Sequence, residues 1–198
     1  MAGAVSSYWD SRYQTGDYVF GTTPSEWLVA HRADLKPGMR ALALADGEGR
    51  NGVWLASQGV LVTCVDQSET AQAKARELAA GRRVTLELVN ADLLVWDWPS
   101  GFDLVLICFL HLPPDARRKV FQQAITALAP GGLLLVEGYH ADGNAKAPPE
   151  NRFTEQNLRE LLKELTIEAV EERTDASDMQ GNPRHVVRVA ARRDAGGR

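Results

Sequence analysis

A short apolar run that breaks into a glycine-rich turn constrains the fold of this chain more than any other feature. Residues 41–45 (Ala-Leu-Ala-Leu-Ala) lead into Asp46 and then Gly47, Gly49 and Gly52, and a helix-like stretch follows directly. Glycine suits such a turn because it tolerates positive φ and lets a ligand approach the backbone closely. A strand, a tight glycine turn and a helix in this order predict the opening of a nucleotide-binding α/β domain.

The charge of the turn favours one class of ligand. Residues 47–52 match the dinucleotide pattern G-x-G-x-x-G, but Asp46 and Glu48 place two carboxylates beside the amides that would hold a pyrophosphate. Like charges repel there, so a phosphate-bearing ligand is disfavoured. S-adenosylmethionine has no phosphate and carries a sulfonium cation and an amino group. We therefore predict S-adenosylmethionine as the cofactor and S-adenosylhomocysteine as its product, with a dinucleotide as the less favoured alternative.

The composition fits one globular α/β domain. The chain has 198 residues, of which 44% are hydrophobic and 24% charged, and its formal net charge is -4. This charge argues against a nucleic-acid partner bound on a broad basic surface. No apolar run has membrane-spanning length, and residues 1–7 lack the features of a signal peptide. We expect a single domain over residues 1–198, cytoplasmic and monomeric or homodimeric, with neither nucleic-acid nor membrane partners.

Alternating apolar runs and helical stretches predict a Rossmann-like, doubly wound α/β sheet with helices on both faces. The expected strands are residues 40–45, 60–65, 84–89, 102–108, 133–137, 167–172 and 186–191. The expected helices are residues 25–35, 51–58, 70–80, 115–128 and 154–165. The last two strands follow each other without a helix between them, so we expect an antiparallel pair that completes a seven-stranded, mostly parallel sheet.

Acidic side chains follow three successive strands, at the edge where open α/β sheets bind ligands. Asp46, Asp66 and Asp92 each stand at the end of an expected strand. Asp66 lies near the distance from the glycine turn at which an acidic residue meets ribose hydroxyls, and Asp92 with Leu93 could hold adenine. A helix cap at Asp66 or Ser68, and a capped turn at Asp92, are the structural alternatives.

Aromatic residues crowd the segment 8–27 around Arg12. They are Tyr8, Trp9, Tyr13, Tyr18, Phe20 and Trp27. One interpretation is a hydrophobic flap that closes one end of the sheet. The other is a lid over the cofactor, with aromatic faces toward the sulfonium and Arg12 toward a carboxylate, and both can hold together. Residues 1–7 are expected to be disordered, and residues 194–198 to form a loose tail.

Three titratable side chains follow the fourth and fifth expected strands and are the candidate catalytic residues. They are His111, Tyr139 and His140, with His185 a more remote candidate. Each could act as a general base if the methyl acceptor needs one. A hydrogen-bonded structural role is the alternative for His111. Residues 141–151, which contain Gly143, Pro148 and Pro149, are expected to form a mobile substrate loop.

Together these segments resemble the class I S-adenosylmethionine-dependent methyltransferases, and within them the branch related to tellurite-resistance and thiopurine methyltransferases. The motifs that carry the resemblance extend over nearly the whole chain: Tyr-Trp-Asp-Ser-Arg-Tyr at 8–13, Tyr-Val-Phe-Gly-Thr-Thr-Pro at 18–24, the glycine turn with Arg50-Asn51, Val-Asp-Gln-Ser at 65–68, Asn-Ala-Asp-Leu at 90–93, His-Leu-Pro-Pro at 111–114 and Leu-Ala-Pro-Gly-Gly-Leu at 128–133. The resemblance implies a sheet ordered 3-2-1-4-5-7-6 with strand seven antiparallel. It also implies methionine-moiety contacts at Gly47, ribose at Asp66 and adenine at Asp92 and Leu93.

The chain departs from the family pattern in two places. Ala43 stands where the superfamily commonly has an acidic residue on its first strand, so Asp46 or Glu48 becomes the candidate partner of the donor's amino group. Residues 141–151 lack the glycine-rich substrate loop that is frequent in the branch. The candidate cofactor-binding residues are Trp9, Arg12, Asp46, Gly47, Glu48, Gly49, Asn51, Asp66, Gln67, Ser68, Asp92, Leu93 and Phe109, and no metal ligands are predicted.

These observations predict in-line S_N2 methyl transfer to a small acceptor such as a thiol, a selenol or a tellurite-like oxyanion. The sulfonium is an activated donor, so positioning and water exclusion are the main demands on the protein. One alternative is a non-catalytic protein that binds S-adenosylmethionine. Another is an NAD-dependent oxidoreductase, which is disfavoured because the chain has no Tyr-x-x-x-Lys and no room for a second substrate domain.

Overall fold

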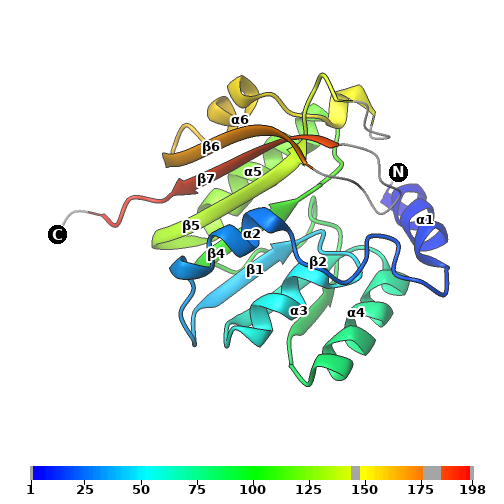
Figure 1. Cartoon of the computed structure of the whole chain (residues 1–198). Coiled ribbons are helices and arrows are strands. Elements are labelled where there is room, and N and C mark those ends of the chain that lie inside the picture. The colour runs from blue at the N-terminus through cyan, green and yellow to red at the C-terminus, as the bar shows by residue number, and fades with distance from the viewer. Residues whose placement is uncertain (1, 144–147, 176–183, 197–198) are drawn as a thin grey trace. The chain divides into compact units, whose positions relative to one another are not determined.

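The computed structural model describes residues 2–143, 148–175 and 184–196, and its contacts gather into two compact units (Figure 1). The first unit is Met1–Asp97 and the second is Trp98–Arg198. The expectation of a single domain stays a prediction.

The first unit contains three parallel strands covered by two helices. The strands are β1 (Arg40–Leu44), β2 (Leu61–Asp66) and β3 (Glu87–Asn90), and the helices packed on them are α3 (Arg50–Ser57) and α4 (Glu69–Arg82). In the register, Ala43 lies opposite Cys64, and Asp66 lies opposite Asn90. The β1 residues 41–44 are buried, as expected of a strand that is apolar along its whole length.

The N-terminal segment differs from its prediction. Helix α1 runs from Ala2 to Tyr13 and contacts α4, whereas the sequence predicted disorder at residues 1–7 and no helix. No amphipathic period marks this segment, so the signal for a helix was missing; the buried Tyr13 side chain holds its end. The helix expected at 25–35 is two shorter pieces, α2 (Glu26–Ala30) and η1 (Arg32–Asp34), which meet at His31.

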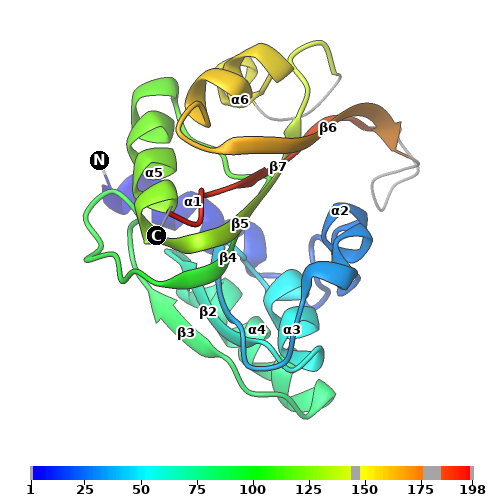
Figure 2. The ribbon, with the colours of Figure 1, turned by 90° about the vertical axis from the view of Figure 1, so that its left-hand side faces the viewer.

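The second unit contains four strands, of which only the last along the chain runs antiparallel to the others (Figure 2). The strands are β4 (Phe102–Cys108), β5 (Leu128–Tyr139), β6 (Thr166–Asp175) and β7 (Arg184–Arg192), and the helices are α5 (Pro114–Ala127), η2 (Pro149–Asn151) and α6 (Glu155–Leu161). Helix α6 begins at a capping box in which Thr154 and Asn157 exchange hydrogen bonds, and it ends at Leu161, earlier than the predicted residue 165. Strand β5 begins earlier than predicted because Leu128 already pairs with Phe102 across a bulge.

The strand order is β3-β2-β1-β4-β5-β7-β6, with β7 antiparallel to both of its neighbours. This order confirms the predicted seven-stranded, Rossmann-like fold. The substrate loop expected at 141–151 lies partly outside the described residues. Its described part includes η2 and the turn after His140. His140 itself forms an isolated β-bridge with Phe153. In the predicted tail at 194–198, residues 194–196 have no helix or strand, and the last two residues are not described.

Candidate functional site

The glycine turn of the first unit has the left-handed backbone that its sequence predicts. Ala45 extends the β1–β2 pairing by donating its N–H to the Val65 carbonyl at 2.8 Å, and its φ is already +50°. Gly47 and Gly49 follow with φ of +56° and +83°, and Gly49 is the N-cap of α3. A Cβ on Gly47 would lie 2.7 Å from the Tyr13 hydroxyl oxygen. The turn therefore needs glycine both for its conformation and for the close approach of Tyr13.

The Asp66 side chain, at the end of β2, points toward this turn. Its Oδ2 accepts the N–H of Gly47 at 2.8 Å, and its Oδ1 accepts the N–H of Ser68 at 2.8 Å. Burial raises the pKa of the Asp66 carboxyl above its ordinary value, against the opposing effect of these two N–H donors. Ser68, whose Oγ accepts from Ala71, is the cap of α4. Of the two candidate caps of α4, Ser68 is therefore the one that caps the helix, whereas Asp66 faces the glycine turn.

Asp46, the first acid of the turn, points toward the start of α3. Its Oδ2 accepts the Gly52 N–H at 2.9 Å and lies 3.4 Å from the Cys64 sulfur. Burial raises the pKa of Asp46 to about 6, and the hydrogen bonds from Gly52 and Cys64 oppose that rise only in part. The Asp46 carboxylate is thus directed into the protein, toward the start of α3.

Glu48 carries the second acidic charge of the turn, and a lysine compensates it. The Lys74 Nζ lies 2.8 Å from Glu48 Oε1, and the Phe20 N–H donates to Oε2 at 3.3 Å. Sequence reasoning missed this pair, because Lys74 is one of several cations along α4 and nothing in its spacing marks it. With Glu48 paired to Lys74, the turn is less negative than its sequence implied, and the electrostatic argument against phosphate is correspondingly weaker.

The aromatic residues at 8–27 pack against one another beside the turn. The Tyr13 ring is buried, stacked on Trp9 with centroids 5.8 Å apart and edge-on to Phe20 at 6.2 Å. Burial raises the pKa of the Tyr13 phenol. Arg12 lies over the Phe20 ring at 5.4 Å. Both the hydrophobic-flap interpretation and the lid interpretation agree with this packing.

This segment is also tied to the strand ends by polar contacts. Asp10 accepts the Ser68 hydroxyl at 2.6 Å, and this hydrogen bond lowers the pKa of Asp10. Asn51, a predicted cofactor contact, is buried and accepts the N–H of Ser25 at 2.9 Å. The Asn51 side chain thereby fixes the start of α2.

A tight turn follows the end of β3. Asp92 Oδ1 accepts the Leu94 N–H at 2.9 Å, which is the capped-turn alternative, while the Leu93 side chain is buried. Gln67, between Asp66 and Ser68, is half-buried. The adenine role of Asp92 and Leu93 stays a prediction.

The second unit separates the predicted catalytic residues into two groups. Tyr139 lies near Phe109, with centroids 4.8 Å apart, and near His111 at 5.9 Å. Phe109, a predicted cofactor contact, has a φ of +55°, so the chain turns sharply as it leaves β4. His140, although adjacent to Tyr139 in sequence, packs elsewhere because successive side chains of a strand point to opposite faces.

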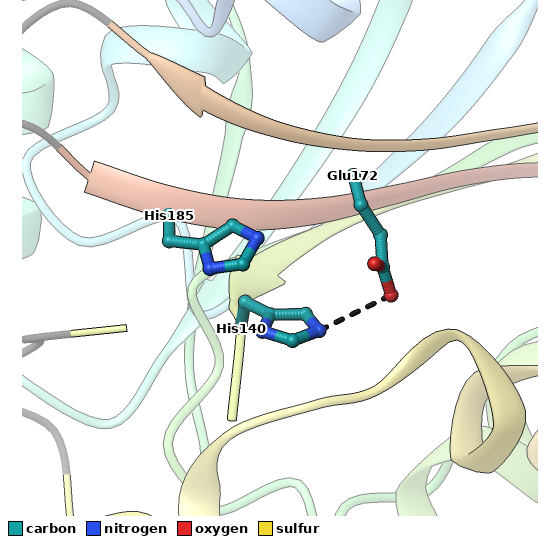
Figure 3. Close-up of side chains that lie close together, drawn as sticks. All are labelled: His140, Glu172 and His185. Carbon is teal, nitrogen blue, oxygen red and sulfur yellow. Dashed lines mark hydrogen bonds and ion pairs between the residues drawn. The ribbon is translucent and has the colours of Figure 1, made fainter. Parts of the chain in front are cut away.

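His140 stacks on His185, with ring centroids 4.0 Å apart, and its Nε2 lies 3.2 Å from Glu172 Oε1 (Figure 3). Sequence reasoning treated His185 as remote and did not consider Glu172. Only the pairing of three strands brings these residues together.

Comparison with known protein families shows which proteins this chain is similar to. Residues 41–132, from β1 through the glycine turn to the first part of β5, match the model of a family described as a methyltransferase domain. This match supports the predicted resemblance to the class I S-adenosylmethionine-dependent methyltransferases. S-adenosylmethionine is the methyl donor of this family, and solved structures of the same fold include ones with bound S-adenosylhomocysteine. These similarities confirm the predicted family resemblance and its cofactor.

Individual relatives are distant. Thiocyanate methyltransferase 1 of Arabidopsis thaliana is 28% identical over 72% of this chain and 65% of its own length. A structure from a study of the conversion of a disulfide bond into a thioacetal group during echinomycin biosynthesis has a TM-score of 0.80 and 22% identity, over 98% of this chain and 94% of that one.

TehB from Haemophilus influenzae has a TM-score of 0.75 and 20% identity, over 96% of this chain and 67% of that one. The chain spans less than two thirds of the length of the first curated relatives it matches. Within the three described stretches of the chain, we find no helix whose length and apolarity would let it cross a membrane.

Proposed function

We propose that this methyltransferase transfers the methyl group of S-adenosylmethionine to a small, soft nucleophile, a thiol, a selenol or a tellurite-like oxyanion. The observation that supports donor binding most directly is Asp66, whose two carboxylate oxygens are oriented by the amides of Gly47 and Ser68 at the end of β2. A carboxylate oxygen accepts more than one hydrogen bond, so Asp66 can also accept from the vicinal ribose hydroxyls. Gly47 and Gly49 allow the left-handed turn that lies beside Asp66.

Chemistry and similarity both favour the soft acceptor. Methyl transfer from a sulfonium needs the nucleophile, the methyl carbon and the sulfur in line, and a thiolate or oxyanion attacks without a general base. The names of two similar proteins include sulfur compounds, thiocyanate in one and a disulfide converted to a thioacetal in the other. Since these proteins are distant, the acceptor class is our proposal for this chain.

A base is required only for a protonated acceptor. His111 and Tyr139, whose rings lie 5.9 Å apart, are the candidates for that role. His140 is a weaker candidate, because its ring already contacts Glu172, His185 and the Asp142 N–H.

Donor binding is tested by calorimetric titration with S-adenosylmethionine, S-adenosylhomocysteine and NAD. We expect the first two to bind and NAD to fail. Asp66→Ala should weaken donor affinity by about tenfold or more, because it removes a charge-assisted acceptor worth roughly 1.5–3 kcal/mol. Asp97→Ala changes an exposed acid of the same unit and should leave affinity unchanged. Equal affinity in the Asp66 and Asp97 variants would refute the ribose assignment.

Turnover is tested separately, with S-adenosylmethionine and a panel of thiols, thiocyanate, selenols and tellurite. Methylation of at least one soft acceptor is expected, and His111→Ala should lower turnover on protonated acceptors by about 10²-fold while sparing donor affinity. Donor binding without methylation of any acceptor would favour the non-catalytic alternative. Equal turnover of wild type and His111→Ala on thiols would remove His111 from the mechanism.

A further inference from the structure

Three side chains that can ligate a metal converge where β5, β6 and β7 run side by side (Figure 3). They are His140, directly after β5, Glu172 on β6 and His185 on β7. One potential ligand atom from each lies within 4.8 Å of those of the other two. The His140 side chain is only 8% exposed, His185 is half-buried and Glu172 reaches the surface. A cation at this point would therefore be reached from the Glu172 side.

The backbone fixes this convergence. His140 donates its N–H to the His185 carbonyl at 2.9 Å, which continues the β5–β7 pairing one residue beyond Tyr139. Glu172 pairs with Val187, two residues from His185. Residues that are opposite, or two apart, on paired strands place their side chains on the same face. The three potential ligands thus share one face because of strand register, and no loop has to fold over to assemble them.

The donor set is chemically specific. Two imidazole nitrogens and one carboxylate oxygen suit Zn²⁺ and the other late first-row divalent cations, and three protein ligands leave a coordination position open. The His140 and His185 rings lie 27° from parallel, so coordination requires the half-buried His185 ring to turn out of the stack. Glu172 is already in place, with its Oε1 held by His140 Nε2 at 3.2 Å and by the Glu155 N–H at 3.3 Å.

The proton of His140 has an alternative position. Its Nδ1 accepts the Asp142 N–H at 3.1 Å, so the neutral ring carries its proton on Nε2, toward Glu172. A metal ion on Nε2 requires that proton to shift to Nδ1. The protonated Nδ1 would then release the Asp142 N–H and donate instead to the Asp142 carboxylate, whose Oδ2 lies 3.9 Å from Nδ1 and would have to move closer. A carboxylate behind a ligating histidine is the usual arrangement in metal sites and orients the ring.

We infer that His140, Glu172 and His185 form a binding site for a divalent transition-metal cation, for which Zn²⁺ is the reference ion. Binding at this site does not depend on methyl transfer. A cation on His140 Nε2 uses the lone pair that a general base would need, so metal occupancy and a base role for His140 exclude each other.

The test uses tag-free, chelator-treated protein, titrated calorimetrically with Zn²⁺ and followed by the visible absorption of bound Co²⁺. We expect one equivalent to bind, with a Co²⁺ spectrum of low coordination number. His185→Ala and Glu172→Gln should each weaken Zn²⁺ binding by at least about tenfold, and Asp142→Asn by about tenfold through loss of the outer carboxylate. His31→Ala, which removes a half-buried histidine of the first unit, is the matched control and should bind as wild type does.

A second measurement distinguishes a lost metal site from a variant that fails to fold. Zn²⁺ should raise the midpoint of thermal unfolding of wild type and His31→Ala but not of Glu172→Gln, because only native protein with an intact site gains from the ligand. Glu172→Gln is nearly isosteric and reaches the surface, so its circular dichroism should match wild type. Equal Zn²⁺ affinity in wild type, Glu172→Gln and His185→Ala, or no stoichiometric binding by wild type, would overturn the inference.

Discussion

Acidic side chains in the two units are compensated in two different ways, by backbone amides or by a cation. In the first, Asp46 and Asp66 are held by backbone N–H groups of the glycine turn and of residues next to it. In the second, the Glu137 carboxylate lies 2.8 Å from the Arg188 guanidinium across the β5–β7 pair, and both side chains are at most 3% exposed. Neutral amides thus hold Asp46 and Asp66, whereas a full cation pairs with Glu137 and, in the first unit, with Glu48.

The type of partner distinguishes acids that can still bind a ligand from acids that only stabilise the core. Amides carry no net charge, so desolvation remains the leading influence and raises the pKa of Asp46 and of Asp66. A carboxylate held only by amides keeps capacity for a further donor such as a ribose hydroxyl. Glu137, next to a cation that is itself buried, is committed to its partner. The ligand-binding acids are therefore expected in the first unit.

The largest effect should come from breaking the pair in the second unit. Arg188→Met leaves the Glu137 carboxylate buried without its guanidinium, and we expect a loss of about 3–5 kcal/mol in the free energy of unfolding, measured by urea denaturation. The double variant Glu137→Leu/Arg188→Met should recover most of that loss, since the remaining groups are apolar. A double variant no more stable than Arg188→Met alone would show that the stranded charge is not the cause.

An intermediate effect is expected from the pH dependence of the first unit. The pKa of Asp46 is about 6 in the folded protein, above its ordinary value of 3.8. A raised acid pKa means that the folded state favours the protonated form, so this contribution to stability is complete below about pH 4 and is lost as the pH rises through 6.

Relative to Asp46→Asn, wild type should thus lose at most about 3 kcal/mol between pH 4 and pH 7. Urea denaturation of both proteins across this range measures the difference. If the stability gap between the two proteins does not change with pH, the Asp46 carboxyl titrates at its ordinary value.

The smallest effect concerns the tight packing of the glycine turn. A Cβ on Gly52 would collide with the Cys64 sulfur and lie 2.7 Å from the Asp46 Oδ2. Gly52→Ala should therefore destabilise the protein by about 1–3 kcal/mol and weaken donor binding by displacing Asp46.

Gly81, within α4, provides the matched control, because its Cβ would meet nothing within 4 Å. Gly81→Ala should stabilise the protein by about 0.5–1 kcal/mol. Thermal unfolding of the two variants should shift in opposite directions, and parallel shifts would argue against a steric cause at Gly52.

Much of the fold followed from the sequence because it depends on short-range patterns. The apolar runs at β1 and β4 and the left-handed glycines after β1 each need only a few neighbouring residues, and all were predicted correctly. Helix α1 was missed because its stability comes from packing, through Tyr13, and not from a periodic apolar face.

The candidate site also has a part that the sequence predicted and a part that it missed. Asp46, Asp66 and the glycine turn lie within about twenty residues of one another, so their spacing indicated a donor site. The Glu48–Lys74 ion pair required the placement of α4 beside the turn, and only the structure shows it.

By itself, the sequence determined the order of strands and helices, the glycine turn and the family of the chain, because these depend on local periodicity and on backbone freedom at single residues. Only the tertiary structure decided which charges remain uncompensated and which distant side chains meet. His140, Glu172 and His185 come together through the register of three strands. Strand pairing joins residues without regard to their separation along the chain, so no spacing in the sequence could have marked them as neighbours.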